Sequence, residues 1–293
     1  MDGGTAGLCG RNAAGTHKGE QMIKVILFSP NGYVGRFLKT KLAECEWISL
    51  SGITRESDLD VFEGEYDILL YTASITSARK ASAEQYIRDN ALCAADMMGF
   101  CEKHRIRRII YLSTDEIYGM LRACEVTEHS AMVSPNIYAA TKYLAEQVIR
   151  ESGIPYYILR LPGIVGRDWG DNFIYRTMEK VRNQEDIYIY NGQKEFNNLV
   201  DIDDLAQFTM VLCNKIECPI SETFVVGNCE KIKLLELVEF MKEMYASSSE
   251  VHDEANSSGR YFTLNVEKAV SYGYRSKSIK NIIYELKELQ YYG

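Results

Sequence analysis

The chain has 293 residues, of which 46% are hydrophobic and 25% are charged, and its formal net charge is −8 at pH 7. This length and composition predict a globular protein with one large hydrophobic core or two modest ones. Acidic and basic residues are interspersed, which excludes a nucleic-acid-binding surface, because such a surface needs a basic stripe. No apolar run approaches the ~20 residues of a membrane span, so we expect no membrane partner.

The eight cysteines are scattered without the paired spacing of a zinc site, and Cys101 with His104 lacks a second pair, so we expect no metal. Unpaired cysteines without a secretory signal favour a reducing, cytoplasmic compartment. Residues 1–21 are rich in Gly, Ala and Thr and lack apolar periodicity. We interpret them as a disordered leader.

From residue 22 to Pro162, apolar strands alternate with helices. The predicted strands are Ile23–Ser29, Trp47–Ile53, Tyr66–Thr72, Arg108–Ser113 and Tyr156–Leu161, and the predicted helices are Val34–Glu44, Ala83–Lys103 and Pro135–Ser152. Near-continuous apolar strands separated by helices indicate a parallel sheet covered on both faces. The predicted fold class is therefore α/β, a Rossmann-type doubly wound parallel sheet.

Beyond Pro162 the regular alternation of long apolar strands and helices ends. Short strands are predicted at Asp186–Tyr190 and Phe224–Val226, and helices at Phe173–Asn183, Asp203–Cys213, Lys233–Tyr245 and 277–289. These pieces suit a smaller α/β substrate lobe that closes over the carboxyl edge of the sheet, where open α/β folds bind ligands. We assign residues 22–165 to a dinucleotide-binding domain and 166–293 mainly to the substrate lobe, with the strand and helix around 186–213 returning to the first domain.

A glycine-bearing turn follows the first strand. Its pattern, Ser29-x-x-Gly32-x-x-Gly35, lies at the N-terminus of the first helix, where backbone N–H groups and the helix dipole favour a pyrophosphate. Gly32 allows close backbone approach and Gly35 allows the helix to pack on the sheet. The cofactor-binding residues predicted in this turn are Ser29, Asn31, Gly32, Tyr33, Val34 and Gly35.

The end of the second strand bears on the choice between NAD and NADP, because an acidic residue there would accept a hydrogen bond from a ribose 2′-hydroxyl. The sequence has Arg55 instead, which would neutralise a 2′-phosphate. The cofactor is therefore NAD or NADP, with NADP slightly favoured, although Arg55 beside Glu56 is equally consistent with a solvated side chain. Asp58 and Leu59 are placed to bind the adenine.

A reaction centre is predicted where the fourth strand meets the helix that follows. Thr114 ends that strand, and Tyr138 and Lys142 lie one turn apart on one helix face. Tyrosine, with a pKa of about 10, is a poor base at neutral pH, and a neighbouring ammonium favours its phenolate. We therefore expect Lys142 to lower the pKa of Tyr138 and to hold the nicotinamide ribose. Tyr138 would then act as acid/base, and Thr114 would hydrogen-bond the reacting oxygen.

Two carboxylates, Asp115 and Glu116, follow Thr114 directly. Beside a hydride-transfer site, such a pair can act as general acid and base for the removal of water. They are equally consistent with polar loop residues or with a cap of the next segment.

These motifs resemble those of the extended short-chain dehydrogenase/reductases, the NAD-dependent epimerase/dehydratase family, over nearly all of residues 22–283. Ser29–Gly35 stands where the family has Gly-x-x-Gly-x-x-Gly, and Tyr138 with Lys142 matches its Tyr-x-x-x-Lys pair. The stretch Ser113–Gly119 is most similar to that of the nucleotide-sugar 4,6-dehydratases. The similarity is specific for the superfamily and weak for the reaction.

The resemblance implies further roles. Ala73 and Ser74 match the segment whose backbone passes under the cofactor, and Asn90 matches an asparagine of the long helix. In this family the long helix and the Tyr/Lys helix often pair with a second subunit. The apolar faces of Ala83–Lys103 and Pro135–Ser152 therefore predict a homodimer.

The chain departs from the family pattern in the turn and in the substrate region. Ser29 replaces the first glycine, and Gly163 replaces an asparagine that often contacts the sugar-nucleotide. Asn197 falls where many members have an arginine that binds the diphosphate, so a two-pronged phosphate contact is lost. The residues predicted to contact the substrate are Thr114, Asn172, Phe173, Asn197 and Asn198, although a helix start and a strand turn without a ligand fit the last four equally well.

The leading hypothesis is an NAD(P)-dependent oxidoreductase or epimerase that acts through a 4-keto group on a sugar, in the first instance a nucleotide-linked one. The second is a nucleotide-hexose 4,6-dehydratase that uses Asp115 and Glu116. The third, motivated by the departures at Ser29, Gly163 and Asn197, is a cofactor-sensing protein that has lost catalysis.

Overall fold

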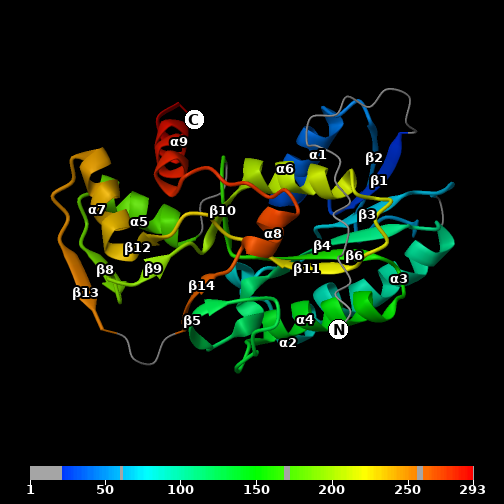
Figure 1. Ribbon diagram of the computed structural model, residues 1–293, viewed down its shortest axis with the longest axis horizontal. Helices are drawn as coiled ribbons and strands as arrows, with labels where there is room; N and C mark the ends of the chain where they lie inside the picture. Colours follow the sequence, from blue (N-terminus) through cyan, green and yellow to red (C-terminus); the bar gives the residue numbers. More distant parts are fainter. Residues whose placement is uncertain (1–21, 60–61, 168–171, 256–259, 293) are drawn as a thin grey trace, which may run out of the picture.

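A computed structural model describes residues 22–59, 62–167, 172–255 and 260–292 (Figure 1). The predicted leader over residues 1–21 lies outside the described residues. No helix in these described ranges is long and apolar enough to cross a membrane.

Within the described residues, six parallel strands form the central sheet, in the order β11-β6-β4-β3-β1-β2. They are β1 (Ile23–Phe28), β2 (Ile48–Ile53), β3 (Ile68–Tyr71), β4 (Arg108–Thr114), β6 (Tyr156–Leu161) and β11 (Glu222–Val225). Every residue of β3 and β4 is buried, as a strand covered on both faces requires. The fold class that we predicted is confirmed. The strand order reverses between β1 and β3, and open α/β sheets bind ligands outside the carboxyl ends of strands at such a point.

Helices cover both faces of the sheet (Figure 1). On one face lie α1 (Tyr33–Ala43) and α6 (Ile202–Cys213), and on the other lie α3 (Cys93–Lys103) and α4 (Ile137–Glu151). The face of α1 that is buried carries Gly35, Leu38 and Leu42, a helical spacing. The buried face of α4 is unusual, because besides apolar residues it carries the polar side chains of Tyr138, Lys142 and Glu146. Buried polar residues of this kind need partners and point to a function.

The single helix that we predicted over Ala83–Lys103 is divided. It consists of α2 (Ala83–Tyr86), a wide π-helical turn η3 (Ile87–Leu92), and α3. Turns of this type are frequent at functional sites. Here the turn buries Asn90, while Leu92 remains exposed. The sequence pattern did not reveal this π-helical turn.

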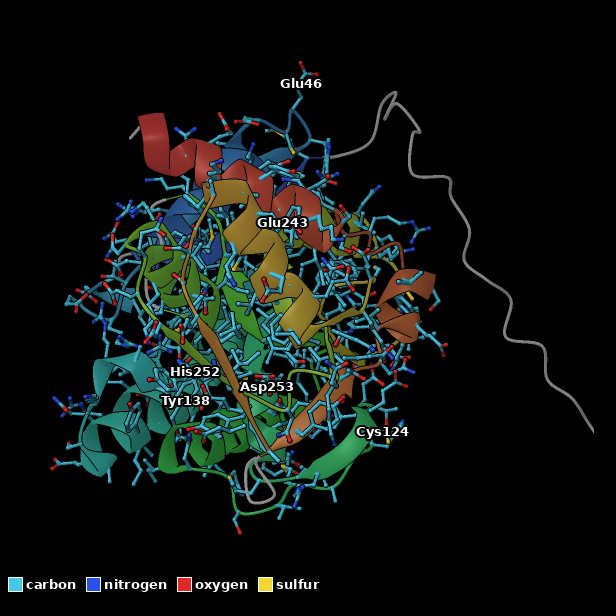
Figure 2. The ribbon with its side chains drawn as sticks, turned by 90° about the vertical axis from the view of Figure 1, so that its left-hand side faces the viewer. Glu46, Cys124, Tyr138, Glu243, His252 and Asp253 are labelled. Atoms are coloured by element: carbon cyan, nitrogen blue, oxygen red, sulfur yellow. The ribbon has the colours of Figure 1, made fainter. Side chains whose placement is uncertain are left out.

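A smaller lobe lies at one end of the molecule (Figure 1). Its elements are α5 (Phe173–Arg182), β8 (Ile187–Tyr190), β9 (Glu195–Phe196), β12 (Ile232–Lys233), α7 (Leu234–Tyr245), β13 (Val251–Glu254) and α9 (Ile279–Tyr292). The strand pairs are β8 with β13 and β9 with β12. Figure 2, viewed from this lobe, shows His252 and Asp253 on β13 and Glu243 on α7 in front of the large domain.

Two strand assignments were wrong. We placed Phe224–Val226 in the smaller lobe, but β11 pairs with β6 as an edge of the central sheet. We expected the strand Asp186–Tyr190 to return to the large domain, but β8 pairs with β13 in the smaller lobe. The helix α6 packs against α1, and its side chain Phe208 lies in the core of the large domain. Short apolar strands carry no local signal for the sheet that they join, because pairing partners are remote in sequence.

Two further strand pairs complete the fold. β5 (Arg122–Val126) pairs with β14 (Tyr261–Leu264), and β7 (Gly163–Val165) pairs with β10 (Leu199–Asp201). After these come α8 (Glu267–Ser271) and the segment that leads to α9. The carboxyl end of β4 continues into a short helix, η4 (Asp115–Tyr118).

Candidate active site

The turn between β1 and α1 has the geometry of a phosphate-binding loop. Gly32 caps α1 without a side-chain hydrogen bond, and the first turn of the helix contains no acidic residue. The first backbone N–H groups of a helix have no partner within it, so they can receive an anion. A Cβ on Gly35 would lie 2.0 Å from the carbonyl oxygen of Ser29, so the helix meets the turn at a distance that glycine alone permits. These residues fit a dinucleotide pyrophosphate.

Ser29 is held in the left-handed region of the backbone, with φ at 73°. Glycine adopts this conformation at little cost, whereas a residue with a Cβ is strained there. Its N–H donates to the carbonyl oxygen of Ile53 at 2.8 Å, which fixes the turn against the end of β2. The departure from glycine that we noted in the sequence therefore stores strain at the predicted pyrophosphate site. The neighbouring residue of the predicted set, Asn31, is exposed, while Tyr33 and Val34 pack on the core.

The end of β2 presents Arg55 toward the segment η3. Its guanidinium donates to the carbonyl oxygen of Asp89 at 3.2 Å and lies near the thiol of Cys93, whose pKa it lowers. Asp58 is exposed, and Leu59 is half-buried against the core beneath α3. Arg55 therefore already has a hydrogen-bond partner within the protein.

Asn90 organises the segment after β3. Its amide oxygen accepts from the N–H of Ile75 at 2.8 Å, and its amide nitrogen donates to the carbonyl oxygen of Ile75 at 3.1 Å and to Thr141 at 3.3 Å. The hydroxyl of Ser74 donates to the same amide oxygen at 3.3 Å. Both ends of the Asn90 amide are thus used, so this residue positions the segment with Ala73 and Ser74 instead of offering free groups to a ligand.

Tyr138 stands where this segment meets β4. Its hydroxyl lies near the hydroxyls of Thr114 and Ser74, close enough for both to act on its pKa. Thr114 Oγ1 accepts from the N–H of Glu116 at 3.2 Å, so its own hydrogen can be donated to Tyr138 or to another oxygen. The hydroxyls of Thr114 at the end of β4, Tyr138 on α4 and Ser74 in the loop after β3 therefore lie together at the carboxyl edge of the sheet.

The protonation of Tyr138 differs from our expectation. Burial raises its pKa well above the usual range, Glu116 adds to this effect, and the hydroxyls of Thr114 and Ser74 oppose it. The expected lowering of this pKa by Lys142 was wrong for this arrangement, because burial disfavours the phenolate more strongly than the neighbouring groups favour it. Tyr138 is therefore a neutral hydrogen-bond donor at pH 7.

Lys142 is buried, with 1% of its surface exposed. Its Nζ donates to the carbonyl oxygen of Leu112 at 2.6 Å and lies 4.1 Å from the ring centroid of Tyr111. Burial lowers the pKa of Lys142 to about 7, Glu146 acts in the opposite direction, and Arg55 lowers it further. One of the three Nζ hydrogens is used by Leu112, so others are available for the ribose hydroxyls of a cofactor.

The two carboxylates after Thr114 have different surroundings. Glu116 accepts from Ser77 Oγ at 2.7 Å and from Asn136 Nδ2 at 2.9 Å, one bond to each oxygen. Asp115 is buried, and burial raises its pKa to about 6 even though Arg260 opposes this. A buried carboxyl next to a carboxylate that accepts two hydrogen bonds is an arrangement that suits an acid and a base.

Asp115 also connects the large domain to the smaller lobe. It lies near the side chain of Asn198, and its Oδ2 lies 3.7 Å from a guanidinium nitrogen of Arg260. The side chain of Arg260 is 42% exposed. Asn198 and Arg260 thus bring polar and cationic groups of the junction to within reach of the residues around Tyr138.

Three residues that we predicted to contact the substrate make contacts within the protein instead. Asn197 is buried, and its amide donates to the carbonyl oxygens of Asn228 and Leu264 and accepts from the N–H of Leu264, so it joins backbone segments instead of lining a cleft. Asn172 caps α5 and donates to the carbonyl oxygen of Ile164 at 2.8 Å. Phe173 is half-buried, with its ring 6.1 Å from that of another aromatic side chain.

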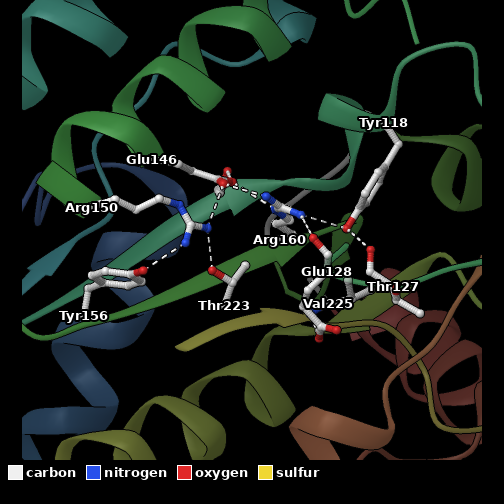
Figure 3. Close-up of polar contacts among 10 residues, drawn as sticks. Tyr118, Thr127, Glu128, Glu146, Arg150, Tyr156, Arg160, Thr223 and Val225 are labelled. Atoms are coloured by element: carbon white, nitrogen blue, oxygen red, sulfur yellow. Dashed lines mark hydrogen bonds and ion pairs between the residues drawn. The ribbon is translucent and has the colours of Figure 1, made fainter. Parts of the chain in front are cut away.

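A buried network of charges joins α4 to β6 (Figure 3). Arg160 on β6 makes a two-pronged pair with Glu146 on α4, with distances of 3.2 and 2.8 Å. Its other nitrogen donates to Tyr118 and to the carbonyl oxygen of Glu128. Sequence reasoning did not identify this network, although Glu146 follows Lys142 by one helical turn and Arg160 interrupts an apolar strand. Asn136, Ser77 and Arg260 were also missed, because their relevance depends on remote contacts.

The comparison with known proteins agrees with this geometry. The model of the NAD dependent epimerase/dehydratase family matches residues 3–227. The chain belongs to this family. The resemblance inferred from the motifs is therefore confirmed, and membership places the chain among enzymes of the extended short-chain dehydrogenase type.

Curated relatives within the family carry out or support sugar chemistry. The chain is 23% identical over 224 residues to the low-salt glycan biosynthesis protein Agl12 of Haloferax volcanii, with 72% of each chain covered. It is 23% identical over 217 residues to the dTDP-D-glucose 4,6-dehydratase of Dictyostelium discoideum, covering 67% of this chain and 50% of that protein.

Solved structures of family members share the fold over almost their whole length. The UDP-glucuronic acid 4-epimerase of Bacillus cereus in complex with NAD superposes with a TM-score of 0.75 at 17% identity, covering 91% of this chain and 99% of the other. The UDP-N-acetylglucosamine 4-epimerase of Methanobrevibacter ruminantium M1 gives a TM-score of 0.77 at 15% identity, covering 93% and 99%. At this sequence identity the similarity shows that the fold is shared, and the reaction has to be inferred from the residues of the site.

Proposed function

We propose that this chain is an NAD-dependent 4-epimerase that oxidises and re-reduces a hydroxyl carbon of a nucleotide-linked sugar. The observation that carries the proposal is the convergence of Thr114 and Ser74 on the hydroxyl of Tyr138, one helical turn from the buried Lys142. The family to which the chain belongs, the NAD dependent epimerases and dehydratases, includes this type of reaction.

The residues of the site suit proton transfer in both directions. A bound nicotinamide supplies the hydride acceptor and donor. In the reductive direction, neutral Tyr138 donates its proton to the carbonyl oxygen of the sugar while Thr114 hydrogen-bonds the same oxygen. In the oxidative direction, Tyr138 takes the hydroxyl proton in its phenolate form and returns that proton in the reductive step. Burial disfavours this phenolate, and the ammonium of Lys142 one helical turn away favours it.

For the cofactor, we propose NAD in place of the slight preference for NADP that Arg55 suggested. The guanidinium of Arg55 donates to the carbonyl oxygen of Asp89, so a 2′-phosphate would have to displace that contact. The solved relative from Bacillus cereus holds NAD. Titration with NADH and NADPH, followed by nicotinamide fluorescence, tests this, and tighter NADPH binding would contradict it.

For the substrate, we propose that Asn198 and Arg260 contact the sugar-nucleotide. Both lie beside Asp115 at the junction of the lobes, and Arg260 offers the guanidinium that Asn197 does not. A guanidinium pairs well with phosphate oxygens. Arg260→Gln is expected to raise KM for the sugar-nucleotide while leaving NADH binding unchanged.

The decisive experiment is Tyr138→Phe in an assay with UDP-glucose, UDP-glucuronic acid and UDP-N-acetylglucosamine. Turnover should fall by about 10²-fold or more, as loss of a general acid/base typically causes. Cofactor affinity should stay unchanged. Tyr143→Phe on the same helix is the control. If the wild-type protein binds NAD but converts none of a wide sugar panel, the non-catalytic cofactor sensor becomes the better description.

A second candidate, 4,6-dehydration, is favoured by Asp115 and Glu116. Their contrasting surroundings, one carboxyl buried with a pKa of about 6 and one held by Ser77 and Asn136, suit an acid and a base that remove water. A dTDP-hexose would then yield a 4-keto-6-deoxy product without external reductant. Epimerised product with the 6-hydroxyl retained would reject this candidate.

We also propose a homodimer. Ile87 and Leu92 of η3 and Leu144 of α4 expose 43%, 55% and 50% of their surfaces on the helices that cover one face of the sheet. Apolar side chains gathered on neighbouring helices favour association with a second copy.

A further inference from the structure

The buried face of α4 carries a row of ionisable side chains one helical turn apart. Tyr138 is followed by Lys142, and Lys142 by Glu146, which has 0% of its surface exposed. Burying a carboxylate and an ammonium in the core is costly unless each has partners. The partners that Glu146 and Lys142 have are therefore informative.

Glu146 is satisfied from outside its own helix. Its Oε1 accepts from Ser113 Oγ at 2.6 Å and from Arg160 Nε at 3.2 Å, and its Oε2 accepts from Arg160 Nη2 at 2.8 Å (Figure 3). A two-pronged guanidinium pair of this geometry stabilises the ionised carboxylate. Glu146 is thus fixed in position against a guanidinium and a hydroxyl.

Lys142 lacks such a partner of its own. Its hydrogen bond goes to the carbonyl oxygen of Leu112, and its other contact is the ring face of Tyr111. Glu146, on the same helix face, is the group that favours its charged form, whereas burial and Arg55 oppose that form. Residues one turn apart on a helix are neighbours, so the carboxylate of Glu146 acts on the charge of Lys142.

The same contacts join two elements of the site. Leu112, Ser113 and Thr114 are consecutive on β4. The carbonyl oxygen of Leu112 accepts a hydrogen bond from Lys142 of α4, and the hydroxyl of Ser113 donates one to Glu146 of the same helix. The helix with Tyr138 is therefore fastened to the strand end with Thr114 immediately beside the reacting groups. A change of register at this point would separate the hydroxyls of Thr114 and Tyr138.

We propose that Glu146 is a positioning residue of the candidate site: fixed by Arg160 and Ser113, it keeps the positive charge on Lys142 and joins α4 to the end of β4. It touches neither substrate nor cofactor and acts through Lys142 and Thr114. The inference rests on the proposed function in one respect, namely that Lys142 has a catalytic task.

Other charged and titratable groups face this pair. Those facing Lys142 are Arg55 beyond β2 and Tyr111 of β4, and those facing Glu146 are Arg160 of β6, Arg150 of α4, Tyr111 of β4 and Tyr118 of η4. Arg150 lies 3.6 Å from Glu146 and is 28% exposed, so solvent screens it more than Arg160.

The test measures the titration of Lys142 directly. Protein labelled with ¹⁵N-lysine is titrated by NMR, with the Nζ signal of Lys142 assigned by its loss in Lys142→Arg. In Glu146→Gln the pKa of Lys142 should fall by about one unit or more, because an opposite charge at short range shifts a pKa by that amount. Glu146→Asp, which keeps the charge, should restore most of the shift. Glu151→Gln, an exposed change of the same kind at the end of α4, should leave it unaltered.

An unchanged titration of Lys142 in Glu146→Gln would overturn the inference. Removing one partner of a buried ion pair can unfold a protein. If Glu146→Gln does not fold, Glu146→Gln with Arg160→Met removes both charges, and the same fall is expected. The result needs no substrate: a shifted titration in a protein that converts no sugar supports the positioning role and rejects the proposed function. In an active protein, the alkaline limb of the pH profile of kcat should move with the titration of Lys142.

Discussion

The helix α1 approaches the turn before it so closely that a Cβ on Gly35 would lie 2.0 Å from the carbonyl oxygen of Ser29. No L-residue with a side chain fits at that distance without movement of the backbone. The contact is made by main-chain atoms on both sides, so rotation of a side chain cannot relieve it. Gly35 and Ser29 therefore fix where the first N–H groups of α1 point.

Gly35→Ala should displace the start of α1. We expect a loss of about 1–3 kcal/mol in the free energy of unfolding, the typical cost of overpacking, and weaker NADH binding. Gly99→Ala in α3 is the matched control, because a Cβ there meets nothing within 4 Å and helix propensity predicts a gain of about 0.5–1 kcal/mol. Urea unfolding and NADH titration measure both. Unaltered stability and affinity in Gly35→Ala would contradict this view of the turn.

Ser29→Gly should relieve backbone strain. A non-glycine residue with φ at 73° costs about 1 kcal/mol or more, so the variant is expected to unfold at higher urea concentration with NADH affinity not weakened. Ala246→Gly, at another left-handed position remote in the fold, should gain stability without any effect on the cofactor. Weaker NADH binding in Ser29→Gly alone would show instead that the serine hydroxyl makes a useful contact.

Asp115→Asn should stabilise the protein above neutral pH. Burial raises the pKa of Asp115 in the folded state to about 6, above the ordinary value of 3.8, so the folded state binds more protons between these values and stability falls as pH rises through them. The variant removes that cost, which amounts to about 2–3 kcal/mol at pH 8.

The advantage of Asp115→Asn should shrink as the pH is lowered from 8 to 5, because the native carboxyl of the wild-type protein then becomes protonated. Urea unfolding at pH 5, 6, 7 and 8 measures it. The exposed change Asp58→Asn should alter the free energy of unfolding by less than about 0.5 kcal/mol at each pH. A constant difference across this range would show that Asp115 does not titrate there.

Leu144→Glu should prevent association if η3 and α4 form the interface between two copies. A charge placed in an apolar contact must be desolvated, so a dimer at micromolar concentration should become a monomer in sedimentation velocity. Tyr284→Glu on α9, equally exposed but on a different element, should leave the mass unchanged. A wild-type protein that sediments as a monomer would end the proposal.

The sequence by itself determined the parts of this protein that depend on local order along the chain. Apolar strands alternating with helices determined the parallel sheet, and the spacing of Gly32 and Gly35 after β1 marked the helix start that suits a phosphate. The pair Tyr138 and Lys142 could be read from helical periodicity, because residues four apart share a face whatever surrounds them.

The tertiary structure alone decided which remote groups meet, since burial and hydrogen-bond partners come from elements far apart in the chain. In the structure, β11 belongs to the central sheet, the amide of Asn197 hydrogen-bonds backbone groups, and Arg260 lies beside Asp115. It also decided the protonation of the site: spacing predicted a lowered pKa for Tyr138, but desolvation by the surrounding core raises it. A sequence pattern indicates which residues are neighbours along one helix or strand. It does not indicate how deeply their charges are buried, and burial determines how strongly those charges interact.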